Sequence, residues 1–141
     1  MTDIKSPTEA ASAVAVSALK AQQARMRVIA ENLANADSTS QTPGGDPYRK
    51  QIPIFQPKML PEGVQGVAMT RVAQDQTPFR QAYEPSNPAA DSNGYVKMPN
   101  VEPLTESLDM REAQRAYNAN LSVIETARAM DTSTLDLIKR P

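Results

Sequence analysis

The sequence predicts an α+β fold, mainly α, in which long N- and C-terminal helices pair as a coiled-coil-like hairpin and a small Pro/Gly-rich middle region forms β-structure. All five glycines lie between residues 44 and 94, and ten of the twelve prolines lie between residues 43 and 103. The flanking segments 8–42 and 104–140 contain neither residue. Because proline and glycine destabilise a helix interior by about 3 and 1 kcal/mol, we expect an N-terminal helical part (1–36), a β/loop part (37–103) and a C-terminal helical part (104–141).

The first helix has a specific start signal. Ser6 is placed as the N-cap, Pro7 as the first helical residue, and Glu9 where a capping-box carboxylate reaches back to the N-cap amide. Asn32 and Asn35, followed by a polar run, predict a helix C-cap and an end near residue 36. An apolar stripe with alternating spacings of four and three residues follows this helix: Ser12, Val16, Leu19, Gln23, Met26, Ala30 and Leu33.

The second long helix is expected to begin around Pro103 and to run almost to the end of the chain. It carries two adjacent stripes, one from Met110 to Ile124 and one from Ala116 to Leu137. Either the two terminal helices simply pair within one domain, or the apolar face, which is wider than one partner helix can cover, also contacts other subunits. The residues predicted to pack between subunits are Val16, Leu19, Met26, Ile29, Leu33, Tyr117, Leu121, Val123, Ile124, Met130 and Leu137.

Short strands are expected in the middle region, at residues 51–56, 66–73, 78–83 and 95–98. Pro53 and Pro57 indicate that the first of them is an edge strand or an extended segment. Asn93-Gly94 is a favoured pair for a tight hairpin turn. The sheet that these segments predict is small.

Composition excludes several classes of function. The net charge is −1, with 15 basic and 16 acidic residues, so no electrostatic field attracts nucleic acid or an anionic membrane. No segment approaches the roughly 20 apolar residues of a membrane helix, so direct membrane insertion is not expected. The N-terminus lacks the pattern of a cleaved secretion signal, and export would need another route. With 20 alanines, no Trp and 4% aromatic residues, the monomer is expected to depend on neighbours for much of its order.

Catalytic chemistry is not expected. The chain has no His and no Cys, which removes the usual general base, the common triads and most transition-metal sites. No glycine pattern for a nucleotide is present. Asp109 and Glu112 share a helical face, but Arg115 three residues further on favours surface ion pairing. We therefore predict no catalytic residue, no cofactor and no metal.

Three segments resemble the flagellar axial family of rod, hook and hook-associated proteins. Asn32-Leu33-Ala34-Asn35 is similar to the Asn-Leu-Ala-Asn signature of that family. Residues 42–51 and 94–101 are similar to proximal-rod members, and residues 113–120 also resemble the family, which usually has an acidic residue where this chain has Asn118. The positions that carry the resemblance are Asn32, Leu33, Asn35, Pro47, Tyr48, Gly94, Tyr95, Pro99 and Asn100.

The resemblance implies a structural subunit of the bacterial flagellar basal-body proximal rod, which crosses the periplasm, transmits motor torque and surrounds the export channel. The implied partners are copies of itself, other rod proteins, the export-gate junction protein and the flagellar type III export apparatus. An alternative from another class is a soluble helical adaptor or chaperone that binds partner helices. Such a protein is expected to be complete alone, whereas a rod subunit completes its packing in the assembly.

Overall fold

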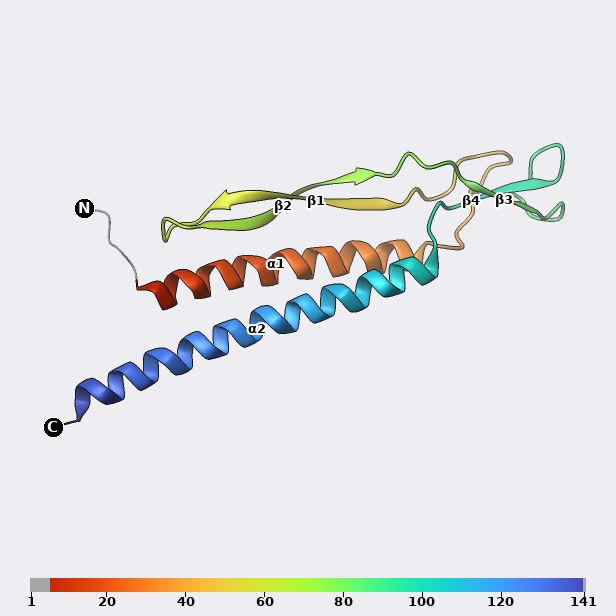
Figure 1. The fold of residues 1–141 in the computed structure, drawn as a ribbon. Coiled ribbons are helices and arrows are strands. Elements are labelled where there is room, and N and C mark those ends of the chain that lie inside the picture. The colour runs from red at the N-terminus through yellow and green to blue at the C-terminus, as the bar shows by residue number, and fades with distance from the viewer. Residues whose placement is uncertain (1–5, 141) are drawn as a thin grey trace. The chain divides into compact units, whose positions relative to one another are not determined.

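The chain folds into two long helices and four strands in a computed structural model that describes residues 6–140 (Figure 1). This order confirms the predicted mainly helical α+β fold. Residues 1–5 and 141, which belong to the predicted terminal parts, lie outside the described residues. The elements in chain order are α1 (Pro7–Ala34), β1 (Gln51–Met59), β2 (Gln65–Gln74), β3 (Arg80–Tyr83), β4 (Tyr95–Met98) and α2 (Pro103–Lys139).

The predicted start of α1 is confirmed by its capping box. The Ser6 amide donates to Glu9 Oε2, and the Glu9 amide donates to Ser6 Oγ, both over 3.3 Å. These reciprocal bonds satisfy two helix-terminal donors. The helix ends at Ala34, two residues before the expected end, where the Asn35 side chain turns back and donates to the Glu31 carbonyl over 2.8 Å.

The described chain forms two compact units, and each draws on separate stretches of sequence. The first unit combines α1 up to Arg25, residues 54–71 and α2 from Glu112 onward; the second combines residues 26–53 and 72–111. Both helices and both strands of the β1–β2 sheet therefore contribute to both units. The three-part division at 36/37 and 103/104 stays a prediction.

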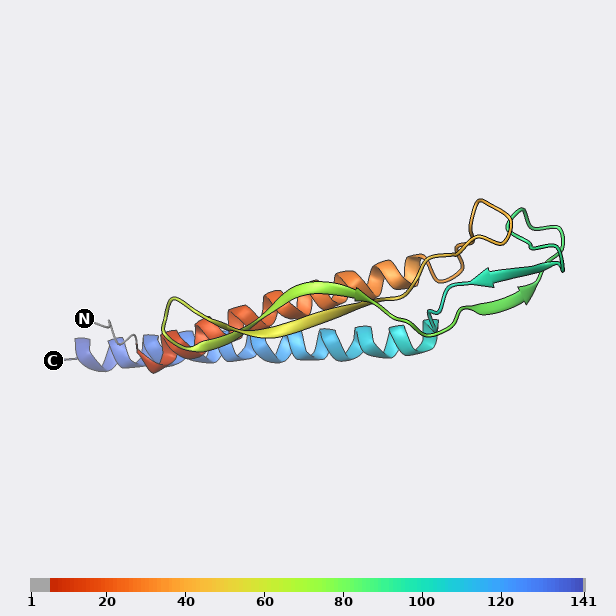
Figure 2. The same ribbon diagram turned by 90° about the horizontal axis from the view of Figure 1, so that it is seen from above.

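In the first unit, α1 and α2 run antiparallel and side by side (Figures 1 and 2). Thr8 Oγ1 donates to Asp131 Oδ1 over 2.5 Å, and Arg25 Nη2 lies 3.4 Å from Glu112 Oε2. The second pair is partly exposed and contributes little to stability. Most of the residues that this unit buries most deeply have small side chains; they include Ala15 and Ala21 of α1 and Ala113, Ile124 and Ala127 of α2.

The stripe predicted for α1 is displaced from the surface that the structure buries. Ala15 is buried, whereas its predicted neighbour Val16 is exposed. Leu19 and Met26 are half-buried, and Gln23 is exposed. Small residues let two helix backbones approach closely, so alanines can form the contact while larger apolar side chains remain outside it.

Strands β1 and β2 form a two-stranded antiparallel ribbon with guarded edges. The Leu60 amide donates to the Val64 carbonyl over 2.9 Å. Because amide directions alternate along a strand, this bond places the nitrogen of Pro57 on the outer edge of β1, where no donor is lost from the ladder. On the β2 side, the Val67 amide donates to the buried hydroxyl of Ser17 in α1 over 3.2 Å.

Strands β3 and β4 form the second sheet, with Arg80 opposite Met98 and Tyr83 opposite Tyr95. The prediction of a tight hairpin at Asn93-Gly94 is wrong, because residues 84–94 separate the two strands. Gly94 instead closes a turn just before β4: its φ is +84° and its amide donates to the Asp91 carbonyl over 3.1 Å.

Candidate assembly surface

Asn32, the first residue of the Asn-Leu-Ala-Asn motif, lies at the centre of a buried polar network in the second unit. Its Nδ2 donates to the Gln51 carbonyl over 2.9 Å and to Glu106 Oε2 over 3.2 Å. Its Oδ1 accepts from the Tyr48 hydroxyl over 2.7 Å and from the Gln51 amide over 2.9 Å. The network therefore joins the end of α1, the chain entering β1 and the first turns of α2.

The default reading of Asn32 as a helix C-cap is wrong. All four of its side-chain hydrogen bonds reach other parts of the chain, and the side chain is buried. Asn35 bonds back to its own helix, as a C-cap does. Of the two motif asparagines, one terminates the helix and the other connects three elements.

Glu106 is the negatively charged member of the Asn32 network and is 1% exposed. Lys50 Nζ lies 2.7 Å from Glu106 Oε1, which gives the buried carboxylate a cation. Burial lowers the pKa of Lys50, but the hydrogen bond to Glu106 and the surrounding negative charges outweigh burial and raise that pKa above its ordinary value. A buried charge of this kind is tolerated because it is both paired and hydrogen-bonded.

Tyr48 is the second titratable residue of the network whose pKa is shifted by its surroundings. Burial raises the pKa of its hydroxyl, and the charges of Glu31 and Glu106 raise it further. The protonated hydroxyl is the form that donates to Asn32. The direction of the shift thus stabilises the hydrogen-bonding state that the structure contains.

A second polar contact holds the turn after β2. Arg49 Nη1 donates to the carbonyls of Asp75 and Thr77 over 2.9 and 3.3 Å. Asn100 Nδ2 donates to the same two carbonyls over 3.1 and 3.0 Å, and Asn100 Oδ1 accepts from the Lys50 amide over 2.7 Å. The Arg49 guanidinium also lies 4.2 Å from the centre of the Phe79 ring.

The remaining motif residues shape the second unit. Pro99 is buried, and its carbonyl accepts from Arg80 Nε over 3.3 Å. Tyr95 meets Tyr83 edge to face, with ring centres 5.3 Å apart. Leu33, Pro47 and Gly94 are half-buried. None of these contacts suggests chemistry; they fix the local fold.

The residues predicted to pack between subunits divide into two sets. Ile29 and Ile124 are buried within the chain itself and are not available to a partner without rearrangement. Leu19, Met26, Leu33 and Tyr117 are half-buried. The exposed set, open to a neighbouring subunit, consists of Val16, Leu121, Val123, Met130 and Leu137. Their assignment to subunit contacts stays a prediction.

Five further large apolar residues of the two helices are exposed, and the sequence did not predict them to pack between subunits. They are Val14 on α1 and Leu104, Leu108, Leu135 and Ile138 on α2. Leu135 and Ile138 lie so close to the C-terminal end of α2 that no described residue of α1 lies opposite them. Together with the exposed set above, they place large apolar side chains at several exposed positions of α2.

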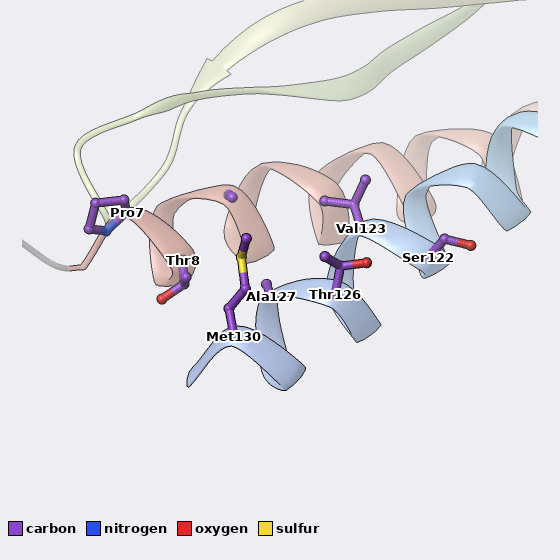
Figure 3. A pocket seen from close by; sticks show the side chains of 8 residues that line it. Pro7, Thr8, Ser122, Val123, Thr126, Ala127 and Met130 are labelled. Carbon is purple, nitrogen blue, oxygen red and sulfur yellow. The ribbon is translucent and has the colours of Figure 1, made fainter. Parts of the chain in front are cut away.

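An apolar groove of about 410 Å³ opens between the start of α1 and the second half of α2 (Figure 3). All of the residues that line it belong to the first unit, and most are small or apolar. They are Pro7, Thr8 and Ala11 of α1 and Ser122, Val123, Thr126, Ala127 and Met130 of α2. We call this depression the groove.

Within residues 6–140, no group of three or more Asp or Glu side chains is arranged to hold a metal ion. No helix in the described part of the chain is long and apolar enough to cross a membrane. The surface features that remain are the exposed apolar residues of α2 and the groove.

Comparison with known proteins relates the chain to flagellar rods. A family model described as "Flagella basal body rod protein" matches residues 13–40, and one described as "Flagellar basal body rod FlgEFG protein C-terminal" matches residues 92–137. The flagellar basal-body rod protein FlgC of Agrobacterium fabrum is 48% identical over 134 residues, which cover 94% of this chain and 96% of that protein. FlgC of Salmonella typhimurium is 46% identical (88% and 92% covered), and FlgC of Borreliella burgdorferi is 38% identical (89% and 94% covered).

Proposed function

Since the chain belongs to the family of FlgC flagellar basal-body rod proteins, we propose that it polymerises through its terminal helices into the drive shaft that transmits motor torque and surrounds the export channel. It is a structural subunit of the rod in the flagellar basal body, it assembles with other rod components, and it is not an enzyme. The relatives favour this role over the helical adaptor considered above.

The observation that supports polymerisation through the helices is the exposed apolar surface of α2. Leu121, Val123 and Met130 are all exposed on a helix that already buries Ala113 and Ala127. Burying a fully exposed side chain of this kind is favourable by about 1.5–3 kcal/mol, and these three are 39%, 44% and 57% exposed, so neighbouring subunits would supply roughly half of that for each. The middle region adds lateral contacts between subunits outside the helical tube.

Transmission of torque requires that the helices be held firmly by the rest of the chain. The Asn32 network fixes the end of α1 and the start of α2 to β1 through buried, paired hydrogen bonds. Networks of this kind rigidify a fold when every member is satisfied. In the proposed rod, this network carries load between the helices and the β region of each subunit.

The route to a periplasm-spanning rod is proposed to be the flagellar type III export apparatus, with the export-gate junction protein as a neighbour after assembly. Passage through a narrow channel requires an unfolded chain, and we propose that the terminal segments 8–36 and 104–139 fold only after they leave that channel. Fusion of a stably folded domain to the chain tests this proposal, because the fusion should block export. Undiminished export of the fusion would refute it.

Mass spectrometry of detergent-washed basal bodies tests the rod assignment in the cell. The chain should be found there in amounts that match other rod components. Recovery of the chain from the cytosol alone, with rods free of it, would reject the proposed function.

A substitution at an exposed apolar position of α2 tests the proposed route of assembly. Leu121→Asp should leave the fold of the monomer unchanged, because the side chain is exposed, yet abolish incorporation into basal bodies and motility. Asn118→Asp is the matched control, since it adds the same charge at an exposed position one turn away. Normal motility with Leu121→Asp would exclude Leu121 from the interface.

A further inference from the structure

Asn93 differs from the other asparagines of the chain in the residue that follows it. Of the seven asparagines, only Asn93 is followed by glycine. The backbone nitrogen of the next residue can attack the side-chain amide of an asparagine, and glycine, which has no Cβ, hinders this attack least. Asn93 is also exposed, so water reaches its side chain. Deamidation therefore meets less steric hindrance at Asn93 than at any other asparagine of the chain.

The turn that contains Asn93 is held together by Asp91. The Asp91 carboxylate accepts hydrogen bonds from the Asn93 amide over 2.9 Å and from the Tyr95 amide over 3.0 Å. The Asp91 carbonyl accepts from the Gly94 amide over 3.1 Å, and the Asp91 amide donates to the Tyr95 carbonyl over 2.9 Å. Asp91 thus bonds to the backbone of Asn93, of Gly94 and of the residue after them.

We propose that Asn93 is a deamidation site of this chain and that the turn formed by Asp91 keeps it from reacting while the chain is folded. In the reaction, the Gly94 nitrogen attacks Cγ of Asn93 and a C–N bond forms, while the Gly94 proton and the side-chain NH2 leave together as ammonia. Water then opens the succinimide and leaves aspartate or isoaspartate at position 93. This chemistry is independent of the role proposed for the helices.

Several contacts of Gly94 oppose the first step. Its N–H is donated to the Asp91 carbonyl, and this bond must break before the nitrogen can turn toward Cγ of Asn93. The attacking nitrogen becomes negatively charged, and the Asp91 carboxylate, which lies against the amides on either side of it, disfavours a second negative charge there. The Gly94 carbonyl accepts from the Glu84 amide over 3.0 Å, which holds the peptide from its other side. The reaction therefore requires local opening of the turn.

Deamidation would alter the second unit at the start of β4. Isoaspartate carries the backbone through the side-chain carbon, so it lengthens the main chain between Asp91 and Tyr95. Tyr95 pairs with Tyr83 in the β3–β4 sheet, and the two rings meet edge to face. The longer backbone displaces Tyr95 either from its bonds to Asp91 or from this pairing.

Peptide mapping by mass spectrometry measures the reaction at mildly alkaline pH, with the chain folded in one sample and unfolded in guanidinium chloride in another. Asn93 should be the first asparagine converted in the unfolded chain. Its conversion should be at least about tenfold slower in the folded chain, because that chain reacts only through the opened turn. Equal rates in the two samples would overturn the protection, and earlier conversion of another asparagine in the unfolded chain would overturn the site.

Asp91→Ala tests the role of the carboxylate, which holds the amides on both sides of Gly94. The folded variant should convert Asn93 at least about threefold faster than the unaltered folded chain, because its turn opens more often. Asp46→Ala is the matched control, since it removes an exposed carboxylate of the same unit that bonds to Lys97 of β4 over 3.0 Å. Equal rates for the two variants would overturn the role of Asp91.

Amide exchange of Gly94 in the unaltered chain measures the same opening without a substitution, so it decides the question even where Asp91→Ala does not fold. The Gly94 amide should exchange more slowly in the folded chain than in the unfolded chain, since its bond to the Asp91 carbonyl must break first. Exchange at the rate of the unfolded chain would overturn the protection.

Discussion

Asn32→Ala is the substitution whose effect on stability follows most directly from the structure. It removes three hydrogen bonds to neutral partners, one from Tyr48 and two with Gln51, and one to the Glu106 carboxylate. A neutral bond contributes about 1 kcal/mol and a bond to a charged group about 1.5–3 kcal/mol. We expect the free energy of unfolding to fall by roughly 4.5–6 kcal/mol, a large share of the total for a domain of this size.

Urea unfolding of the full chain measures this loss. Three of the four tyrosines, Tyr48, Tyr83 and Tyr95, lie in the second unit, and the chain has no Trp, so tyrosine fluorescence reports mainly on that unit. Asn35→Ala is the matched control, because it removes one hydrogen bond to its own helix and should cost less than about 1 kcal/mol. Equal unfolding midpoints for the two variants would refute the claim that the Asn32 network holds the unit together.

Three further predictions test other contacts by the same unfolding assay. Lys50→Met leaves a buried carboxylate without its cation and should cost about 3–5 kcal/mol. Because the folded chain raises the Lys50 pKa, the unaltered chain should lose stability as pH rises above 10.5, the ordinary lysine value. The Lys50→Met variant should not show this pH-dependent loss, and identical pH profiles for the two chains would contradict the prediction. Gly66→Ala places a Cβ 2.5 Å from Ser17 Oγ and should lower the free energy of unfolding by about 1–3 kcal/mol. Adding Ser17→Ala should recover part of that loss; if the stability losses of the two substitutions simply add, the clash is not their cause. Gly94→Ala combines a φ of +84° with a tyrosine ring at 2.8 Å, so it should destabilise more than Gly63→Ala, where φ is +77° and nothing lies within 4 Å; equal losses would exclude the ring as a cause.

Features set by local chemistry could be predicted from the sequence. The capping residues Ser6 and Glu9 act within one turn, so the start of α1 follows from their order alone. The confinement of proline and glycine to the middle of the chain fixed both helices to within a few residues. The family and the structural role, which rested on the quoted motifs, are confirmed by the relatives.

Features set by distant contacts could not be predicted. Asn32 has partners 16, 19 and 74 residues away, and its spacing in the helix is equally compatible with a C-cap. The Asn93-Gly94 pair has the right chemistry for a hairpin, but whether a turn joins two strands directly depends on the register that their other contacts select. The stripe through Val16 is misplaced because hydrophobicity ranks alanine low, although the chain buries Ala15 and Ala21 and leaves Val16 exposed.

The guarded edges of the β1–β2 ribbon have a consequence for how copies can associate. In a polymer, neighbouring chains are held at very high effective concentration, and an open strand edge would then nucleate sheet-to-sheet growth in competition with the intended lattice. Pro57 removes a donor from one edge, and Ser17 occupies the Val67 donor on the other. The ribbon is thus a poor template for cross-β growth, which leaves helix packing as the favoured mode of association.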